Sequence, residues 1–194
     1  RFRCSKGAVD RFEKSIDAIV KVRDDPQEER GVKITIYPDD PNMRATRMVT
    51  EMMILVGEGM GRLGSDEDIP LPFRKQDAPS EMPDSEFLNH FPEKYCRAQA
   101  MYKYMKGATT SFIPGQHWGL GLSSYVQWSS PIRRYLDLLS HYQVKRWARG
   151  EGVMEGNQVT ATVERGEGAV QTANGVMRNT SRYWIAEYLD RIKG

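Results

Sequence analysis

The sequence is poor in cysteine and contains no long apolar run, and both shortages narrow the classes of protein to consider. Its 194 residues include two cysteines, Cys4 and Cys96, and neither belongs to a CxxC pair. A disulfide scaffold or a structural zinc site would need more cysteines at closer spacing. We therefore expect two reduced thiols in an intracellular protein. No apolar stretch approaches the roughly 20 residues that span a bilayer, so we expect no membrane segment.

An excess of charge of one sign is also missing. The 28 basic and 26 acidic residues leave a net charge of +2, which does not by itself predict nucleic-acid binding. Basic residues nevertheless gather in two stretches, one at Arg133, Arg134, Lys145, Arg146 and Arg149, the other at Arg178, Arg182, Arg191 and Lys193. The sequence has no HExxH, P-loop or GxSxG motif, which argues against the enzyme classes that depend on them.

Hydrophobic periodicity predicts a helix-rich α+β fold. Short strands are expected at residues 16–22 and 32–37, where β-branched residues alternate with polar ones. Helical spacing is found at 44–63, in pieces over 83–106, at 131–150 and at 159–192, the last with a bend near 166–168 or 175. A loop around a short PLPFR element should connect the first two helical regions, and the glycine-rich residues 115–122 should be irregular.

The most informative segment begins at Ser130. Ser130 is a good N-cap and Pro131 suits the first helical position, so the pair predicts a helix start. Arg133 and Arg134 would then lie beside free backbone N–H groups, where cations oppose the helix dipole unless an anion is bound. Because apolar residues surround the rest of this helix, we expect a buried tip that grips a phosphate. The alternative is an ion pair between Arg133 and Asp137 on a solvated edge.

The glycine-rich stretch upstream offers a second candidate contact. Its glycines allow close approach of the backbone to a ligand, His117 can form a hydrogen bond, and Trp118 can stack on a base. The alternative is a glycine-rich turn with a packed tryptophan.

These segments together resemble the ribonuclease II/R family of RNB-domain exoribonucleases. Ser130–Tyr135, with Asp137 and His141 after it, resembles the family's SPIRRYxDxxxH signature. Three weaker likenesses occur in family order, between His117–Tyr125 and HFGL…Y, between Val49–Met53 and LVEExM, and between Pro72–Gln76 and LYRxH. The resemblance implies that residues 1–194 are a partial RNB domain, its later half.

The family implies an activity and a site. Its members hydrolyse single-stranded RNA from the 3′ end to nucleoside 5′-monophosphates, with Mg²⁺ held by an aspartate cluster. Carried onto this sequence, Arg133 is the catalytic residue that contacts the scissile phosphate. The RNA-binding candidates are Ser130, Arg134, Tyr125, His117 and Glu51. The resemblance further implies single-stranded RNA as partner, a larger ribonucleoprotein or RNA-processing assembly as a candidate setting, and a mitochondrial or chloroplast location with the cytoplasm as alternative.

The sequence also departs from the family pattern. The aspartate cluster and the flanking RNA-binding barrels are absent, Gln76 stands where the family has histidine, and Tyr142 stands where it has arginine. We therefore expect no metal ligands in this chain, Mg²⁺ in the parent enzyme only, and no RNA cleavage by the chain alone. Two alternatives stay open: an inactive RNB-fold subunit that binds RNA or scaffolds a ribonucleoprotein, and a helical interaction module without any RNA role.

Overall fold

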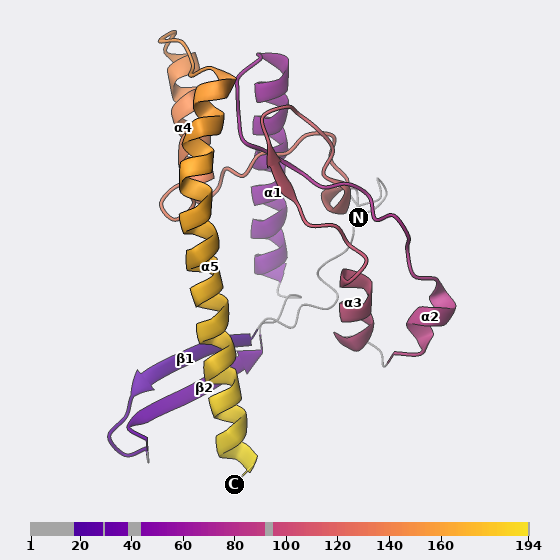
Figure 1. Cartoon of the computed structure of the whole chain (residues 1–194), viewed down its shortest axis with the longest axis vertical. Helices are drawn as coiled ribbons and strands as arrows, with labels where there is room; N and C mark the ends of the chain where they lie inside the picture. The colour runs from indigo at the N-terminus through magenta and orange to yellow at the C-terminus, as the bar shows by residue number, and fades with distance from the viewer. Residues whose placement is uncertain (1–17, 29, 39–43, 92–94, 194) are drawn as a thin grey trace. The chain divides into compact units, whose positions relative to one another are not determined.

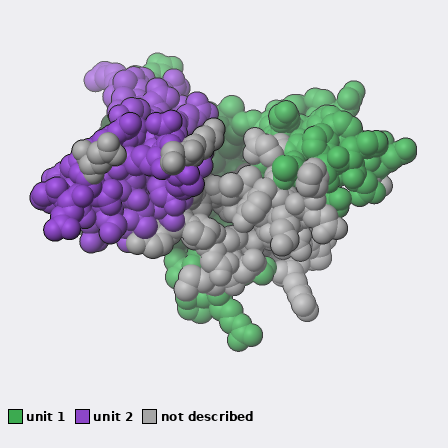
Figure 2. Space-filling view, turned by 90° about the horizontal axis from the view of Figure 1, so that it is seen from below, with its two compact units in different colours: residues 1–14, 41–164 green, residues 15–40, 165–194 purple. Residues whose placement is uncertain are grey.

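The computed structural model describes residues 18–28, 30–38, 44–91 and 95–193, and it has the helix-rich α+β character that the sequence predicts (Figure 1). The chain forms two compact units, residues 1–14 with 41–164 and residues 15–40 with 165–194 (Figure 2). The elements in chain order are β1 (Ala18–Asp24), β2 (Val32–Pro38), α1 (Arg44–Asp66), β3 (Phe73–Lys75), α2 (Ser85–Asn89), α3 (Tyr95–Tyr102), β4 (Thr109–Ser111), the 3-10 helix η2 (Trp118–Leu120), α4 (Tyr135–Ala148) and α5 (Gly156–Lys193).

The smaller unit contains an antiparallel hairpin and the later part of α5. β1 pairs with β2 so that Ala18 lies opposite Pro38, close to the two predicted strands. Arg191 of α5 donates from Nη1 to the carbonyl of Val32 at 2.7 Å. Glu187, one turn earlier, accepts from Arg191 and from Arg30 in the hairpin connection. Arginine and glutamate side chains thus join the hairpin to the helix.

In the larger unit, α1 packs through glycine rather than through its long apolar side chains. A Cβ atom at Gly57 would lie 2.3 Å from Cε2 of Tyr125, and one at Gly61 would lie 2.9 Å from the Tyr125 nitrogen. The backbone N–H of Val126 donates to the carbonyl of Gly57 at 3.1 Å. Gly57 and Gly61 are therefore closely packed, whereas Gly59 faces open space.

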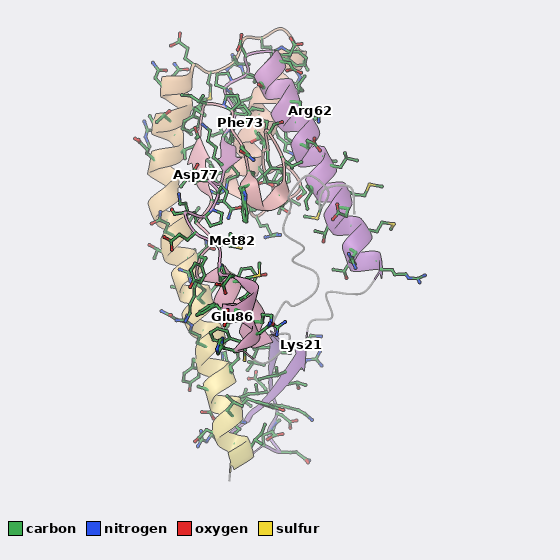
Figure 3. All side chains as sticks on the ribbon, turned by 90° about the vertical axis from the view of Figure 1, so that its right-hand side faces the viewer. Lys21, Arg62, Phe73, Asp77, Met82 and Glu86 are labelled. Atoms are coloured by element: carbon green, nitrogen blue, oxygen red, sulfur yellow. The ribbon has the colours of Figure 1, made fainter. Side chains whose placement is uncertain are left out.

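The apolar residues that reveal the helical spacing of α1 lie mostly on its exposed side. Met48, Met52 and Leu55 are each more than half exposed. Figure 3 shows thioether sulfur atoms projecting from the first half of this helix. Hydrophobic periodicity therefore identifies the helix, but the glycines mark the face that packs against the rest of the unit.

The core of this unit centres on Phe73 in β3, around which side chains crowd (Figure 3). Phe73 is buried with Ile69, Leu71 and Val126, and pairs with Val126 through an isolated bridge. β3 also pairs with β4, antiparallel, with Phe73 opposite Ser111. These pairings bring residues 73–76 beside residues 116–126, which positions the candidate site.

Two helices complete the chain. α4 runs from Tyr135 to Ala148, so it begins four residues later than the sequence predicts. α5 continues from Gly156 to Lys193 as one uninterrupted helix, through the glycines at which a bend was predicted (Figure 1). Neither of these nor any other helix in the described ranges has the length and apolar character needed to cross a bilayer.

Candidate functional site

Residues 130–134 form a turn before α4 instead of its first helical turn. The N–H groups of Arg133 and Arg134 donate to the carbonyl of Ser130 at 3.2 and 3.0 Å. Pro131 therefore occupies the second position of a turn, which its fixed φ angle suits as well as a helix start. The N-cap residue of α4 is Arg134, whose backbone is extended and whose side chain makes no capping bond. The prediction of a helix start at Ser130 is wrong.

The carboxylate of Asp137 explains this geometry. Asp137 is fully buried, and its Oδ2 atom accepts the N–H of Ser130 at 2.8 Å. The same oxygen accepts two donors from Arg134, which also donates to Oγ of Ser129 at 3.0 Å. Because this acid in the first turn of α4 binds the Ser130 amide, residues 130–134 stay outside the helix. Arg134 is engaged within the protein, and Asp137 pairs with it and not with Arg133, the partner in the alternative ion pair.

Arg133 differs from its neighbour. Its side chain is exposed and makes no hydrogen bond or ion pair within the part of the chain that the structure describes. The prediction of a buried tip is therefore wrong for this chain, and Ile132 beside it is fully exposed. The turn instead leaves the Arg133 guanidinium accessible to an anionic ligand.

The prediction that α4 is surrounded by buried apolar groups is also wrong. Leu138 and Tyr142 are about half exposed, whereas Asp137, Ser140 and Gln143 are fully buried. Hydrogen bonds offset the cost of burying these polar groups. Gln143, for example, donates to the carbonyls of Pro70 and Met154 and accepts the Met154 amide, at 3.0–3.1 Å.

A second side chain of α4 holds the segment that leads into the turn. The ring of His141 stacks on the ring of Trp128, with centroids 3.9 Å apart and an angle of 20° between the planes. Nε2 of His141 lies 3.0 Å from the carbonyl oxygen of Trp128. Asp137 and His141, one helical turn apart, therefore fix residues 128–134 at two points.

His117 and Tyr125, both predicted to contact RNA, lie together. Their ring centroids are 5.7 Å apart and the rings are nearly perpendicular. Backbone hydrogen bonds between His117 and Leu122 close the glycine-rich loop, and η2 lies inside it. Both rings line a cavity of about 350 Å³, whereas Trp118 does not line it. Tyrosine residues therefore line the cavity where the sequence suggested a tryptophan.

The remaining residues show the limits of motif reasoning. Glu51 is exposed on α1 and does not line the cavity. Sequence reasoning missed Tyr102, Lys106 and Gln127, which line the cavity but belong to no motif. The Arg134–Asp137 pair was also missed, although its i,i+3 spacing is a signal that could have revealed it.

The Mg²⁺ that the family resemblance implies finds no ligand set here. The described residues contain no group of three or more histidine, cysteine, aspartate or glutamate side chains that could hold a metal ion. Within the described ranges, the side chains present therefore do not fit a metal centre.

Comparison with known proteins gives the family. A model of the RNB domain matches residues 2–150, and the chain belongs to the RNB-domain family of ribonucleases. It is 37% identical over 192 residues to an uncharacterized ribonuclease of Synechocystis sp., and 37% identical over 200 residues to ribonuclease II, chloroplastic/mitochondrial, of Arabidopsis thaliana. Both alignments cover 98% of the chain but 27% and 23% of those proteins. The chain thus spans about a quarter of the length of these relatives.

Solved structures share the fold at low sequence identity. An active-site mutant of the Dss1 exoribonuclease from Candida glabrata matches with a TM-score of 0.74 and 19% identity, over 94% of this chain and 23% of that one. RNase R of Mycoplasma genitalium in complex with ribose-methylated single-stranded RNA matches with a TM-score of 0.53 and 19% identity, over 75% of this chain and 26% of that one. These likenesses show the α+β fold expected of the family.

Proposed function

We propose that this chain is part of a 3′–5′ exoribonuclease that hydrolyses single-stranded RNA to nucleoside 5′-monophosphates, and that it supplies the phosphate-contacting arginine. The proposal depends on one observation, that two adjacent arginines have different surroundings. Asp137 engages Arg134, and Arg133 is left exposed on the same turn. The family match and two relatives named as ribonucleases support RNA as the substrate.

The chemistry assigned to Arg133 is electrostatic. Negative charge on the phosphoryl oxygens shifts during hydrolysis, and a guanidinium held at the scissile phosphate stabilises that charge with forked N–H donors. The turn restrains the Arg133 backbone through its hydrogen bond to Ser130, so the side chain starts from a fixed point. Mg²⁺ in the parent enzyme would supply an activated water, and its ligands would come from residues other than those described here.

The remaining candidates have supporting parts in this proposal. Ser130 and Arg134 shape the turn through Asp137, and His117 and Tyr125 line the cavity beside β3. Glu51 contributes a ribose contact in this proposal, on the strength of its place in the LVEExM-like segment. The similarity to a chloroplastic/mitochondrial relative supports a location in an organelle.

Replacement of Arg133 by alanine in the full-length protein tests the proposal. We expect hydrolysis of a labelled single strand to slow by roughly a hundredfold or more, as when one transition-state donor is removed. RNA affinity should change much less, since other contacts to the strand remain. Arg62→Ala is the matched control, because Arg62 is exposed on α1 and pairs with Glu58. Wild-type turnover by Arg133→Ala would refute the role of Arg133.

A second candidate function is an inactive RNB-fold subunit that binds RNA. It is favoured by Gln76, which stands where the family has histidine and whose amide donates one hydrogen bond and accepts another inside the protein. Incubation of the full-length protein with Mg²⁺ and a 3′-labelled strand separates the two candidates. Release of labelled mononucleotide supports the exoribonuclease, and salt-sensitive binding without release supports the inactive subunit.

A further inference from the structure

The cavity beside β3 has a lining whose charge is of one sign. Arg74 and Lys106 lie in its wall, and among the residues that the structure describes no aspartate or glutamate lines it. Its volume of about 350 Å³ falls in the range of small-molecule sites, roughly 300–1,000 Å³. None of the residues of the 130–134 turn lines it. A cationic cavity of this size favours a small anion-bearing ligand.

The rim of the cavity is fixed by side chains from the end of β3. Gln76 donates from Nε2 to the carbonyl of Lys106 at 2.7 Å, and its Oε1 accepts the N–H of Gly119 at 3.0 Å. Arg74 donates to the carbonyl of Ala108 at 3.1 Å and to Oγ1 of Thr110 at 2.9 Å. The segment that carries Lys106 is therefore tied to β3 at two points. A ligand would meet a wall that is already formed, which lowers the ordering cost of binding.

Two features of the wall suit a nucleoside. Tyr125 is set in place, because its ring packs against Gly57 and lies edge-on to His117. A fixed aromatic ring can receive a base of any sequence by stacking. The Gln127 amide, half-buried in the same wall, forms no hydrogen bond within the described ranges, and can donate and accept at a base edge.

Lys106 supplies the matching charge. Its side chain is exposed at the cavity and makes no ion pair with any acid that the structure describes. We infer that this cavity binds a nucleoside monophosphate unit, with the base against Tyr125 and Gln127 and the phosphate toward Lys106. The inference rests on the proposed function, which makes such units from RNA. The unit can come from free product or from a nucleotide within the strand.

Binding to the full-length protein tests this, measured by equilibrium dialysis with labelled AMP, with adenosine, and with the dinucleotide ApA. We expect AMP to bind more tightly than adenosine. Lys106→Gln should weaken the affinity for AMP by about tenfold, which is the effect of losing one charge-assisted hydrogen bond. Lys103→Gln removes a nearby exposed charge outside the cavity lining and should leave AMP affinity unchanged. Gln127→Ala should weaken the affinity for both AMP and ApA.

The outcomes separate the sources and the two proposals. If AMP binds and Lys106→Gln weakens its binding, the cavity holds free product. If only ApA binds and Lys106→Gln weakens its binding, the cavity holds a nucleotide within the strand. Equal affinity for adenosine and AMP, or binding unaffected by Lys106→Gln, overturns the inference. Arg133→Ala should slow hydrolysis by roughly a hundredfold or more and leave AMP binding unchanged. If wild-type protein cleaves RNA but binds neither AMP nor ApA, only the cavity inference fails.

Discussion

Arg134 meets Asp137 through one carboxylate oxygen. Both Nη2 and Nε of Arg134 bind Oδ2, at 2.6 and 3.0 Å, and the same atom accepts the Ser130 amide. The other oxygen, Oδ1, is buried and has no hydrogen-bond partner among the residues that the structure describes. A single oxygen atom therefore joins Ser130 and Arg134, the two ends of the turn that presents Arg133.

We predict that Asp137→Asn loosens this turn. The amide keeps the size of the side chain but removes the negative charge that faces Arg134, whose side chain is 27% exposed. Loss of one partner from a largely buried pair should lower the free energy of unfolding by about 2–4 kcal/mol. RNA hydrolysis should fall as well, because Arg133 would be held less firmly. Urea unfolding and steady-state hydrolysis by the full-length protein measure the two effects.

Glu151→Gln provides the comparison. Glu151 is half exposed, and its Oε1 atom lies 3.8 Å from Nη1 of Arg149. Loss of its charge should therefore change the free energy of unfolding by less than about 0.5 kcal/mol. If Asp137→Asn were as stable and as active as this variant, the turn would not depend on the carboxylate.

The outcome at this turn shows what the sequence could and could not predict. Asp137 stands four residues after Arg133 and three after Arg134, and both spacings allow an ion pair on a helix. Which arginine pairs with Asp137 depends on the hydrogen bond from the Ser130 amide to the Asp137 carboxylate. That hydrogen bond forms only when residues 130–134 are not helical. Local propensity favours the helix start, and the contact across seven residues overrides it.

The elements themselves were more predictable than the contacts between them. The helix from Arg44 follows from apolar spacing alone, because that signal is local. The packed face of this helix does not follow from apolar spacing. The close approach of Tyr125 requires glycine there, whereas hydrophobicity alone would favour methionine. The cavity joins residues from 74 to 127 through strand pairing, and no local pattern reports such pairing.

The packing of α1 gives a prediction with an internal control. Gly57→Ala places a Cβ atom 2.3 Å from Cε2 of Tyr125 and 2.7 Å from the Val126 carbonyl oxygen. Overpacking of this kind costs about 1–3 kcal/mol, which exceeds the gain of up to about 1 kcal/mol in helix propensity. Gly59→Ala meets nothing within 4 Å and should stabilise the helix by about 0.5–1 kcal/mol. Thermal unfolding of the two variants should shift in opposite directions.

The two variants also probe Tyr125. Because the Tyr125 ring packs on Gly57, Gly57→Ala should displace the ring and weaken the binding of any ligand that stacks on it. Gly59→Ala should leave that binding unchanged. A stabilised Gly57→Ala protein would show that α1 does not closely approach residues 124–126.

The hairpin unit should respond to acid through Glu187. Hydrogen bonds from Arg191 and then from Arg30 hold the pKa of Glu187 below its ordinary value of 4.5. A depressed pKa means that the folded unit binds the proton less readily than the unfolded chain. The stabilisation is thus complete above 4.5 and is lost as the pH falls through the lower, folded value. The protection of the β2 amides against hydrogen–deuterium exchange, measured relative to the intrinsic exchange rate at each pH, should therefore fall in that window.

Glu187→Gln isolates this contribution. The variant keeps a hydrogen-bonding side chain but cannot titrate, so at neutral pH its β2 amides should exchange faster than those of the wild type. On acidification the difference between the two proteins should shrink, because the wild-type carboxylate becomes neutral as well. Asp190→Asn is the control, since Asp190 is 73% exposed and lies 4.0 Å from Arg30. A difference between wild type and Glu187→Gln that stayed constant with pH would mean that ionisation of Glu187 does not hold the hairpin to α5.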